Sequence, residues 1–357
     1  MSISADDLYR FILENAEERE GQMICRVPTG PWLRTKQTRG NRRLARAKLI
    51  KELEERGLVT RPHPQSGWVI VNDPPSPAAS ANVQFRHDAQ ATRQRHRRLQ
   101  SYMRRNVLNG KQFICSSWDE FESSIRADCT FKEGQLSHIG KHYDLTLAAR
   151  PLRIVVVGQE VGAKGKARTT LAERYANVHG GSGMNKRFVK DGKHPSRNPH
   201  MKGTTLALRT ILGTGSGIER KGEFINVDGE QVHLFDCFAL VNRLLCAAHL
   251  TGTSTGMSTK TMLRNCQRHF QATLEILEPT VVVLQGVRMW KWSKNVLVPK
   301  RTLSDNLIEC SLGGKTTLVA AFSHPSSYGK KPIRWDSPDA PYFKDVVYPT
   351  LRQAVPL

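Results

Sequence analysis

The sequence predicts an α/β protein built from two domains. Four short runs rich in β-branched residues alternate with stretches of helical periodicity along the C-terminal two thirds of the chain. The 357 residues exceed the length of one average domain, and residues 73–81 have the Pro-, Ser- and Ala-rich composition of a linker. We therefore expect a small N-terminal domain over residues 1–73, a linker and basic helix over 74–109, and an α/β domain over 110–357.

The first domain opens with a short amphipathic pattern. The apolar residues between Leu8 and Ile12 are spaced to share one helical face. A second helix is predicted over residues 41–56, where apolar residues repeat near the helical period and Gly57 follows at the position of a C-terminal cap. Two β-rich runs then flank a turn at residues 63–67, which is the pattern of a two-stranded hairpin.

Helices followed by a basic helix and a hairpin resemble a winged helix-turn-helix module. That module lays a helix in the major groove of DNA. The resemblance therefore implies that DNA is contacted by Arg42, Arg43 and Arg46, near the start of the second helix. A small winged helix that docks on another protein is the alternative.

The charge of the chain indicates a polyanionic partner. Its 54 Lys and Arg residues outnumber 32 Asp and Glu residues, so the formal net charge is +22. Double-stranded DNA is the expected partner, and an Arg-rich helix that includes Arg97 and Arg98 is a further candidate contact. Because no apolar run approaches the roughly 20 residues of a membrane span and residues 1–7 do not resemble a signal peptide, we expect a cytoplasmic protein without a membrane partner.

The seven cysteines are widely scattered and contain no CxxC pair. Neither a disulfide framework nor an ordinary zinc finger is therefore expected, and we assign no metal or other cofactor. One metal site stays open as an alternative because its histidine spacing could place both rings on one side of a turn. It would combine Cys115, Cys129, His138 and His142.

The second domain is predicted to contain a four-stranded, mostly parallel sheet flanked by helices. Its strands are the β-branched runs that begin at residues 153, 232, 280 and 316. In such sheets ligands bind beyond the carboxyl ends of the strands. This position nominates the polar residues that follow or end the runs, namely Gln159, Glu160, Asp236 and His324.

The motifs at these strand ends resemble the uracil-DNA glycosylase superfamily. They are Gly-Gln-Glu-Val-Gly at 158–162, Phe-Asp-Cys-Phe at 235–238 leading to Asn242-Arg243, Leu-Gln-Gly at 284–286, and Ser-His-Pro-Ser at 323–326. The resemblance implies a DNA glycosylase that hydrolyses the N-glycosidic bond of a flipped-out base and leaves an abasic site. It also implies catalytic roles for Glu160, which would orient water or stabilise the sugar cation, and for His324, which would stabilise the departing base.

Two departures from the family pattern bear on the base. Gly162 stands where the uracil enzymes carry a tyrosine against the pyrimidine 5-position, so a larger base could enter. Asp236 is predicted where those enzymes read uracil with asparagine, and a carboxylate suits an exocyclic amine. We therefore expect a 5-modified cytosine as the substrate, with Gln159 as a further base contact, and a role in defence against phage DNA.

Further residues are candidates for DNA contact. His200 lies near the position where similar enzymes stack on the extruded base. The other candidates are basic or polar residues of two loops, namely Lys164, Lys166, Ser326, Ser327, Tyr328, Lys330 and Lys331, with Tyr328 as a wedge in the vacated stack.

Three other functions stay open. The chain could be a winged-helix regulator whose inactive α/β domain senses a base, an ordinary uracil repair glycosylase, or a hydrolase of free nucleosides. The high positive charge is hard to explain for so small a substrate as a nucleoside. We expect the protein to act as a monomer.

Overall fold

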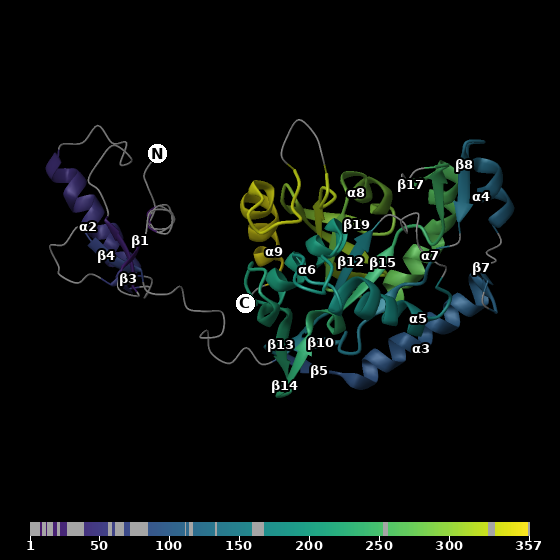
Figure 1. The fold of residues 1–357 in the computed structure, drawn as a ribbon, viewed down its shortest axis with the longest axis horizontal. Coiled ribbons are helices and arrows are strands. Elements are labelled where there is room, and N and C mark those ends of the chain that lie inside the picture. Colours follow the sequence, from purple (N-terminus) through teal and green to yellow (C-terminus); the bar gives the residue numbers. More distant parts are fainter. Residues whose placement is uncertain are drawn as a thin grey trace. The chain divides into compact units, whose positions relative to one another are not determined.

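A computed structural model describes two compact units, residues 1–82 and 83–357. Both are drawn in Figure 1. The described residues are 8, 12, 17–19, 22–26, 39–55, 59–60, 68–71, 85–110, 112–113, 117–132, 134–158, 168–252, 256–327 and 333–355. No helix within these ranges is long and apolar enough to cross a membrane.

The first unit contains a four-stranded antiparallel sheet and a helix. The sheet order is β1 (Glu17–Arg19), β2 (Gln22–Arg26), β4 (Trp68–Val71) and β3 (Val59–Thr60), and the helix is α2 (Arg39–Glu55). Ile50 and Leu53 of α2 are buried, as are Leu8 and Ile12. The helix and the hairpin β3–β4 occur where the sequence predicts them. The hairpin β1–β2 was not predicted. It pairs with β4 and extends the hairpin β3–β4 to a four-stranded sheet.

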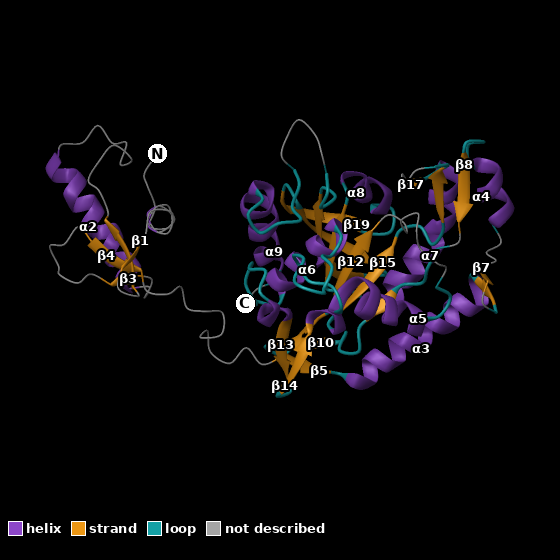
Figure 2. Ribbon diagram, in the orientation of Figure 1, coloured by secondary structure: helices purple, strands orange, loops and turns teal. Residues whose placement is uncertain are grey.

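A seven-stranded sheet forms the centre of the second unit, with helices on both faces (Figure 2). Its order is β19 (Val298–Ser304), β20 (Leu307–Leu312), β21 (Lys315–Phe322), β18 (Val281–Gln285), β12 (Ile154–Gly158), β15 (Phe238–Asn242) and β9 (His138–Ile139). The four strands β21, β18, β12 and β15 run parallel. The remaining three strands are antiparallel additions at the two edges.

The sequence located three of the four parallel strands, but its assignment of the second strand to residues 232–238 is wrong. That stretch contains the end of β14 (Glu230–His233) and a 3-10 helix, η3 (Leu234–Asp236). The His233 side chain accepts a hydrogen bond from the Phe235 N–H at 3.0 Å and so caps this short helix. The parallel strand starts only at Phe238, so Asp236 precedes the strand.

The two faces of the sheet explain why its strands read as continuous apolar runs. Ile154 and Val156 pack in one core with the helices α6 (Pro199–Ile211) and α9 (Tyr348–Ala354). Val155 and Val157 pack in a second core with α3 (Ala89–Asn106) and α7 (Lys260–Leu277). A strand covered on both faces cannot alternate apolar with polar residues.

The basic helix α3 belongs to the second unit and is not a segment outside it, as the sequence analysis had placed it. Its own residues Leu99 and Met103 are completely buried. Arg95 points inward and donates hydrogen bonds to Asp144 at 2.9 Å and to the Ile276 carbonyl at 2.7 Å. Arg97 and Arg98 lie on its exposed face, where they remain candidates for phosphate contact.

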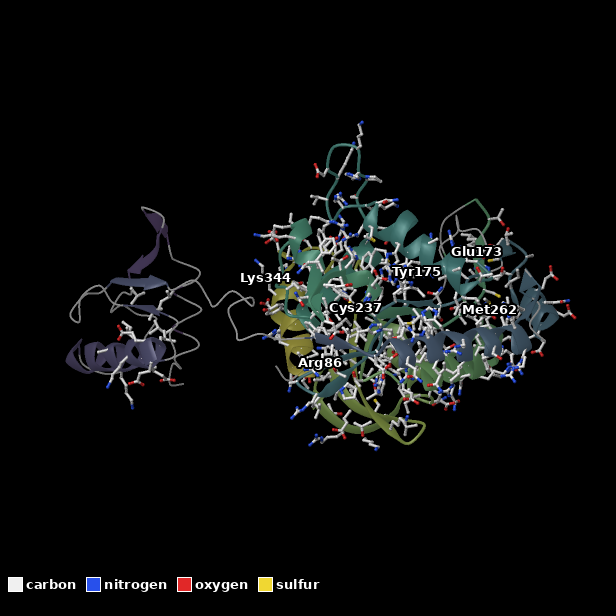
Figure 3. All side chains as sticks on the ribbon, turned by 90° about the horizontal axis from the view of Figure 1, so that it is seen from below. Arg86, Glu173, Tyr175, Cys237, Met262 and Lys344 are labelled. Carbon is white, nitrogen blue, oxygen red and sulfur yellow. The ribbon has the colours of Figure 1, made fainter. Side chains whose placement is uncertain are left out.

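Smaller elements surround the central sheet. A five-stranded sheet has the order β11 (Arg150–Leu152), β10 (Leu145–Leu147), β5 (Phe85–His87), β13 (Phe224–Val227) and β14. The other strands are β8 (Cys129–Lys132), β16 (Ala247–Leu250) and β17 (Gly256–Met257) in one sheet, and β6 (Leu108–Asn109) and β7 (Gln112–Phe113) in another. The other helices are α4 (Trp118–Ser124), α5 (Leu171–Ala176), α8 (Val287–Ser293), η1 (Asn177–Met184), η2 (Arg220–Glu223) and η4 (Phe343–Val347). In Figure 3 Cys237 lies in the interior of this unit, in agreement with its complete burial.

Candidate functional site

Three neighbouring parallel strands end in residues that face α6. Gly158 ends β12, Asn242 ends β15 and Gln285 ends β18. Each is separated by an even number of positions from the residues of its strand that pack against α6, so it faces the same side of the sheet. Gly158 pairs directly with Asn242. The parallel strands β15 and β18 follow β12 in the chain and lie on opposite sides of it. Such a reversal of strand order creates a binding site at the carboxyl edge of an α/β sheet.

His200 reaches this edge from the first turn of α6. Asn198 caps the helix by accepting a hydrogen bond from the Met201 N–H at 2.9 Å, and Pro199 occupies the first turn. A Cβ atom on Gly158 would lie 3.1 Å from Cε1 of His200, so the absence of a side chain lets this ring approach the strand end. The His200 ring is nearly parallel to that of His324, with 6.1 Å between centroids and 15° between planes.

His324 follows β21 and has a defined tautomer. The backbone N–H of Ser326 donates to Nδ1 of His324 at 3.2 Å, and the Ser326 hydroxyl lies 2.8 Å from the same nitrogen. Because Nδ1 accepts, the proton of the neutral ring must be on Nε2. Burial lowers the pKa of His324, although Asp336 acts in the opposite direction. His324 is therefore a neutral N–H donor at pH 7.

A buried tryptophan holds the loop that carries His324. The indole N–H of Trp335 donates to the Ser323 carbonyl at 2.7 Å, and its backbone N–H donates to the Pro325 carbonyl at 3.1 Å. Trp335 itself is completely buried. Ser326 and Ser327 follow in a tight turn, which the Ser327 N–H closes by donating to the His324 carbonyl at 2.8 Å. Trp335 thus holds the loop, and Ser326 holds the ring of His324 within it.

Gly203 in the middle of α6 lets the helix approach this loop. A Cβ atom there would lie 2.4 Å from Cγ of Pro325 and 3.1 Å from the indole of Trp335. Gly203→Ala is therefore expected to destabilise the protein by about 1–3 kcal/mol through overpacking. Gly180→Ala is the control, since its nearest contact would be an ordinary 3.8 Å. Urea unfolding of both variants measures the difference, and an equal stability of the two would contradict the close packing of α6 on the loop.

His200 is kept neutral by its surroundings. Burial lowers the pKa of His200 to about 3, the neighbouring His324 and Arg174 add to this, and Gln285 opposes it. The positive end of the α6 dipole also disfavours a charged ring at this position. His200 and His324 therefore present two uncharged imidazoles at the strand ends.

Two buried amides beside these rings have unused hydrogen-bonding groups. The Thr204 hydroxyl donates to the His200 carbonyl at 3.0 Å and accepts from Nε2 of Gln285 at 3.1 Å, so Oε1 of Gln285 is left as an acceptor. Oε1 of Gln285 and Nδ2 of Asn242 are buried and have no hydrogen-bond partner among the described residues. Buried polar groups are nearly always paired, so one free acceptor and one free donor at the same edge favour a polar ligand there.

The structure brings some of the predicted site residues together and separates others. The rings of His200 and His324 lie 6.1 Å apart. Asp236 does not join them, because it precedes the amino end of β15, whereas the site lies at the carboxyl ends of the strands. There Asp236 accepts a hydrogen bond from the Tyr175 hydroxyl at 2.8 Å and lies 3.4 Å from Nε2 of His179. Asn242 takes the strand-end position that the sequence analysis gave to Asp236. Gln159, Glu160, Gly162, Lys164, Lys166, Tyr328, Lys330 and Lys331 lie outside the described residues, as do the side chains of Arg42, Arg43 and Arg46.

The alternative metal site is not formed by its described members. Cys129 lies in β8 and His138 in β9, which belong to different sheets. Nε2 of His138 donates to the Phe235 carbonyl at 2.9 Å, and the ring of His142 lies against His87. Within the described ranges no group of three or more His, Cys, Asp or Glu side chains could hold a metal ion, and Cys115 lies outside those ranges.

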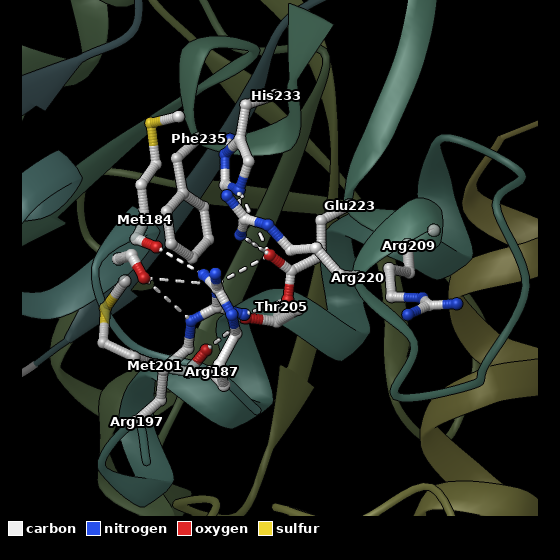
Figure 4. A network of polar contacts seen from close by, with 12 residues as sticks. Met184, Arg187, Arg197, Met201, Thr205, Arg209, Arg220, Glu223, His233 and Phe235 are labelled. Carbon is white, nitrogen blue, oxygen red and sulfur yellow. Dashed lines mark hydrogen bonds and ion pairs between the residues drawn. The ribbon is translucent and has the colours of Figure 1, made fainter. Parts of the chain in front are cut away.

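A basic hairpin-like loop, residues 186–196, leads into α6. Its ends are joined by hydrogen bonds from the Arg187 N–H to the Pro195 carbonyl at 3.0 Å and from the Arg197 N–H to the Arg187 carbonyl at 2.8 Å. Arg197 is buried at its base and pairs with Glu223 (Figure 4). The loop carries Lys186, Arg187, Lys190 and Lys193 against Asp191, so phosphate contact beside His200 is electrostatically favoured.

The sequence matches no model of a known protein family and no curated protein. The candidate site is therefore interpreted from its own geometry and chemistry.

Proposed function

We propose that this protein is a DNA glycosylase that releases a flipped-out pyrimidine from double-stranded DNA and leaves an abasic site. The observation that supports the proposal is that Nε2 of His324, an N–H donor, and two buried amide groups lie at the carboxyl edge of a parallel sheet without a hydrogen-bond partner among the residues that the structure describes. The resemblance at the strand ends and the net charge of +22 support it independently.

The chemistry follows from where charge develops. The bond between C1′ of the sugar and the base nitrogen breaks, its electron pair leaves with the base, and a water oxygen bonds to C1′ while its proton is released. The departing base is an anion, and a preorganised N–H donor such as that of His324 stabilises it without becoming charged itself. By the resemblance, Glu160 is the residue that orients the water or stabilises the sugar cation.

The choice of base depends on the amides. Asp236, the residue expected to accept from the exocyclic amine of cytosine, precedes the amino end of β15 and so lies away from the two amides. Asn242 and Gln285 together offer a donor and an acceptor, which complement the edge of uracil as well as that of cytosine. By the resemblance, Gly162 would leave the 5-position of the base without a wall, so a 5-modified cytosine, and with it a role against phage DNA, stays part of the proposal beside uracil.

One experiment tests the function and the base together. Labelled duplexes that contain uracil, cytosine or a 5-modified cytosine are incubated with the full chain and then treated with alkali, which cleaves abasic sites. We expect cleavage of at least one duplex, and Glu160→Gln should bind the same duplex without base release. A mobility shift without cleavage of any duplex would instead support a regulator that senses a base.

A further inference from the structure

The exposed face of α3 is rich in arginine. The helix contains no Asp, Glu or Lys. Leu99 and Met103 on its opposite side are completely buried, so the exposed side chains extend from a backbone that is fixed in place. Its exposed basic residues are Arg93, Arg97, Arg98, Arg104 and Arg105.

These arginines form two rows along the helix. At 3.6 residues per turn, Arg93, Arg97 and Arg104 fall within about 40° of one another around the axis. Arg98 and Arg105 form the second row, about 110° away around the helix. The rows therefore border an exposed and uncharged ridge, which consists of Gln90, Gln94 and Ser101.

Helix stability explains this pattern only in part. Arg104 and Arg105 lie in the last turn, where the helix dipole favours a positive charge. Arg93 and Arg97 lie outside that turn, and like charges four residues apart destabilise a helix. Glutamate or glutamine at one of these positions would be more favourable. The pattern therefore favours an anionic partner, and arginine suits phosphate because its planar fork can donate two hydrogen bonds at once.

The arginine face lies away from the candidate site. Leu99 and Met103 of α3 pack on one face of the central sheet, whereas α6, which carries His200, packs on the other. Arg95 donates to the Ile276 carbonyl at 2.7 Å, shortly before the amino end of β18. The neighbouring arginines of α3 are therefore close to the amino edge of the sheet, opposite to the carboxyl edge where the site lies. In Figure 1 the helix runs along the lower margin of the unit.

We propose that the arginine face of α3 binds the phosphate backbone of a segment of duplex DNA other than the segment at the candidate site. Because the two rows contact phosphates, and phosphate contacts carry no sequence information, this binding is independent of sequence. The protein thereby holds two segments of DNA at once, either two duplexes or two distant stretches of one. The inference concerns binding alone and does not require the glycosylase function.

A triple variant, Arg93→Gln/Arg97→Gln/Arg98→Gln, removes part of this surface from the full chain. Glutamine is a good helix former, so the melting temperature should equal or slightly exceed that of the wild type. The logarithm of the affinity for an unmodified duplex falls with the logarithm of salt concentration, and the slope should be shallower by about 2 to 3, since each phosphate contact contributes about 0.9. The matched control removes the same charge from exposed positions of other elements and should keep the wild-type slope. It is Lys221→Gln/Lys344→Gln/Arg352→Gln.

Retention of a second duplex tests whether the surface is separate from the candidate site. Wild-type protein held on an immobilised duplex should retain a second, labelled duplex, whereas the arginine triple variant should bind the first and lose the second. Equal retention by these two proteins, or equal salt slopes in the two triple variants, would overturn the inference. If the wild type releases no base from any duplex but retains the second duplex through these arginines, the DNA-binding surface stands and the proposed glycosylase function fails.

Discussion

His324→Ala is expected to lower the rate of base release about 100- to 1000-fold, the usual effect of removing one donor that faces developing negative charge. The ring is not needed for folding of its loop, because Trp335 holds that loop through the carbonyls of Ser323 and Pro325. Stability and DNA affinity should therefore change little. Single-turnover base release, measured beside urea unfolding and DNA binding, separates the three quantities.

The tautomer of His324 gives this prediction a pH signature. A neutral ring with its proton on Nε2 does not lose that proton between pH 6.5 and 9, and burial lowers the pKa of His324, which keeps the ring neutral over this range. The contribution of His324 should thus stay constant across these values. A wild-type rate that falls through pH 6.5 to 7.5, with no such fall in His324→Ala, would show that the charged ring is the active form. Ser326→Ala is a useful control, since the backbone N–H of Ser326 still fixes Nδ1.

The parallel strands β12, β18 and β21 could be predicted because each is buried on both faces and therefore reads as a continuous apolar run. The second strand was predicted to start too early in the sequence. The apolar run around Phe235 is also buried, and periodicity cannot distinguish a short strand from a 3-10 turn. The helix α3 was read as a free basic helix for a similar reason. Its sequence shows seven arginines over residues 86–105 but not that Arg95 pairs with Asp144 from a distant segment.

The candidate site was predictable only in part. His324 and His200 are marked by the local patterns that surround them, a His-Pro-Ser turn and an Asn-Pro helix start. Asn242 ends the run Phe-Ala-Leu-Val-Asn, so a correct boundary for β15 would have identified it. Gln285 belongs to the Leu-Gln-Gly motif at 284–286, but the sequence does not show that its Oε1 is buried without a partner among the described residues.

The largest expected loss of stability comes from Glu223, which lies at the centre of the network in Figure 4. Its carboxylate receives hydrogen bonds from Arg197 and Arg220, and Nε2 of His233 lies 3.2 Å away. The side chains of Glu223 and Arg197 are 1% and 0% exposed. Glu223→Gln leaves buried positive charge without its partner, so we expect a loss of about 3–5 kcal/mol in the free energy of unfolding. Glu219→Gln is the control, since the Glu219 side chain is 58% exposed and its pair with Arg209 should contribute little.

The same carboxylate should make the protein sensitive to acid. Burial alone would raise the pKa of Glu223, but hydrogen bonds from His233 and Arg197 outweigh it and lower the pKa to about 2. A depressed pKa stabilises the fold above the unfolded value of roughly 4.3, and this contribution, on the order of 3 kcal/mol, is lost as the pH falls toward 2. Urea unfolding between pH 6 and 2.5 should show this loss in the wild type and a shallower slope in Glu223→Gln. If the free energy of unfolding falls equally with acid in both proteins, the acid-sensitive group lies elsewhere. Arg197 directly precedes the Asn198 cap of α6. Glu223→Gln should therefore also displace His200 and reduce base release at neutral pH.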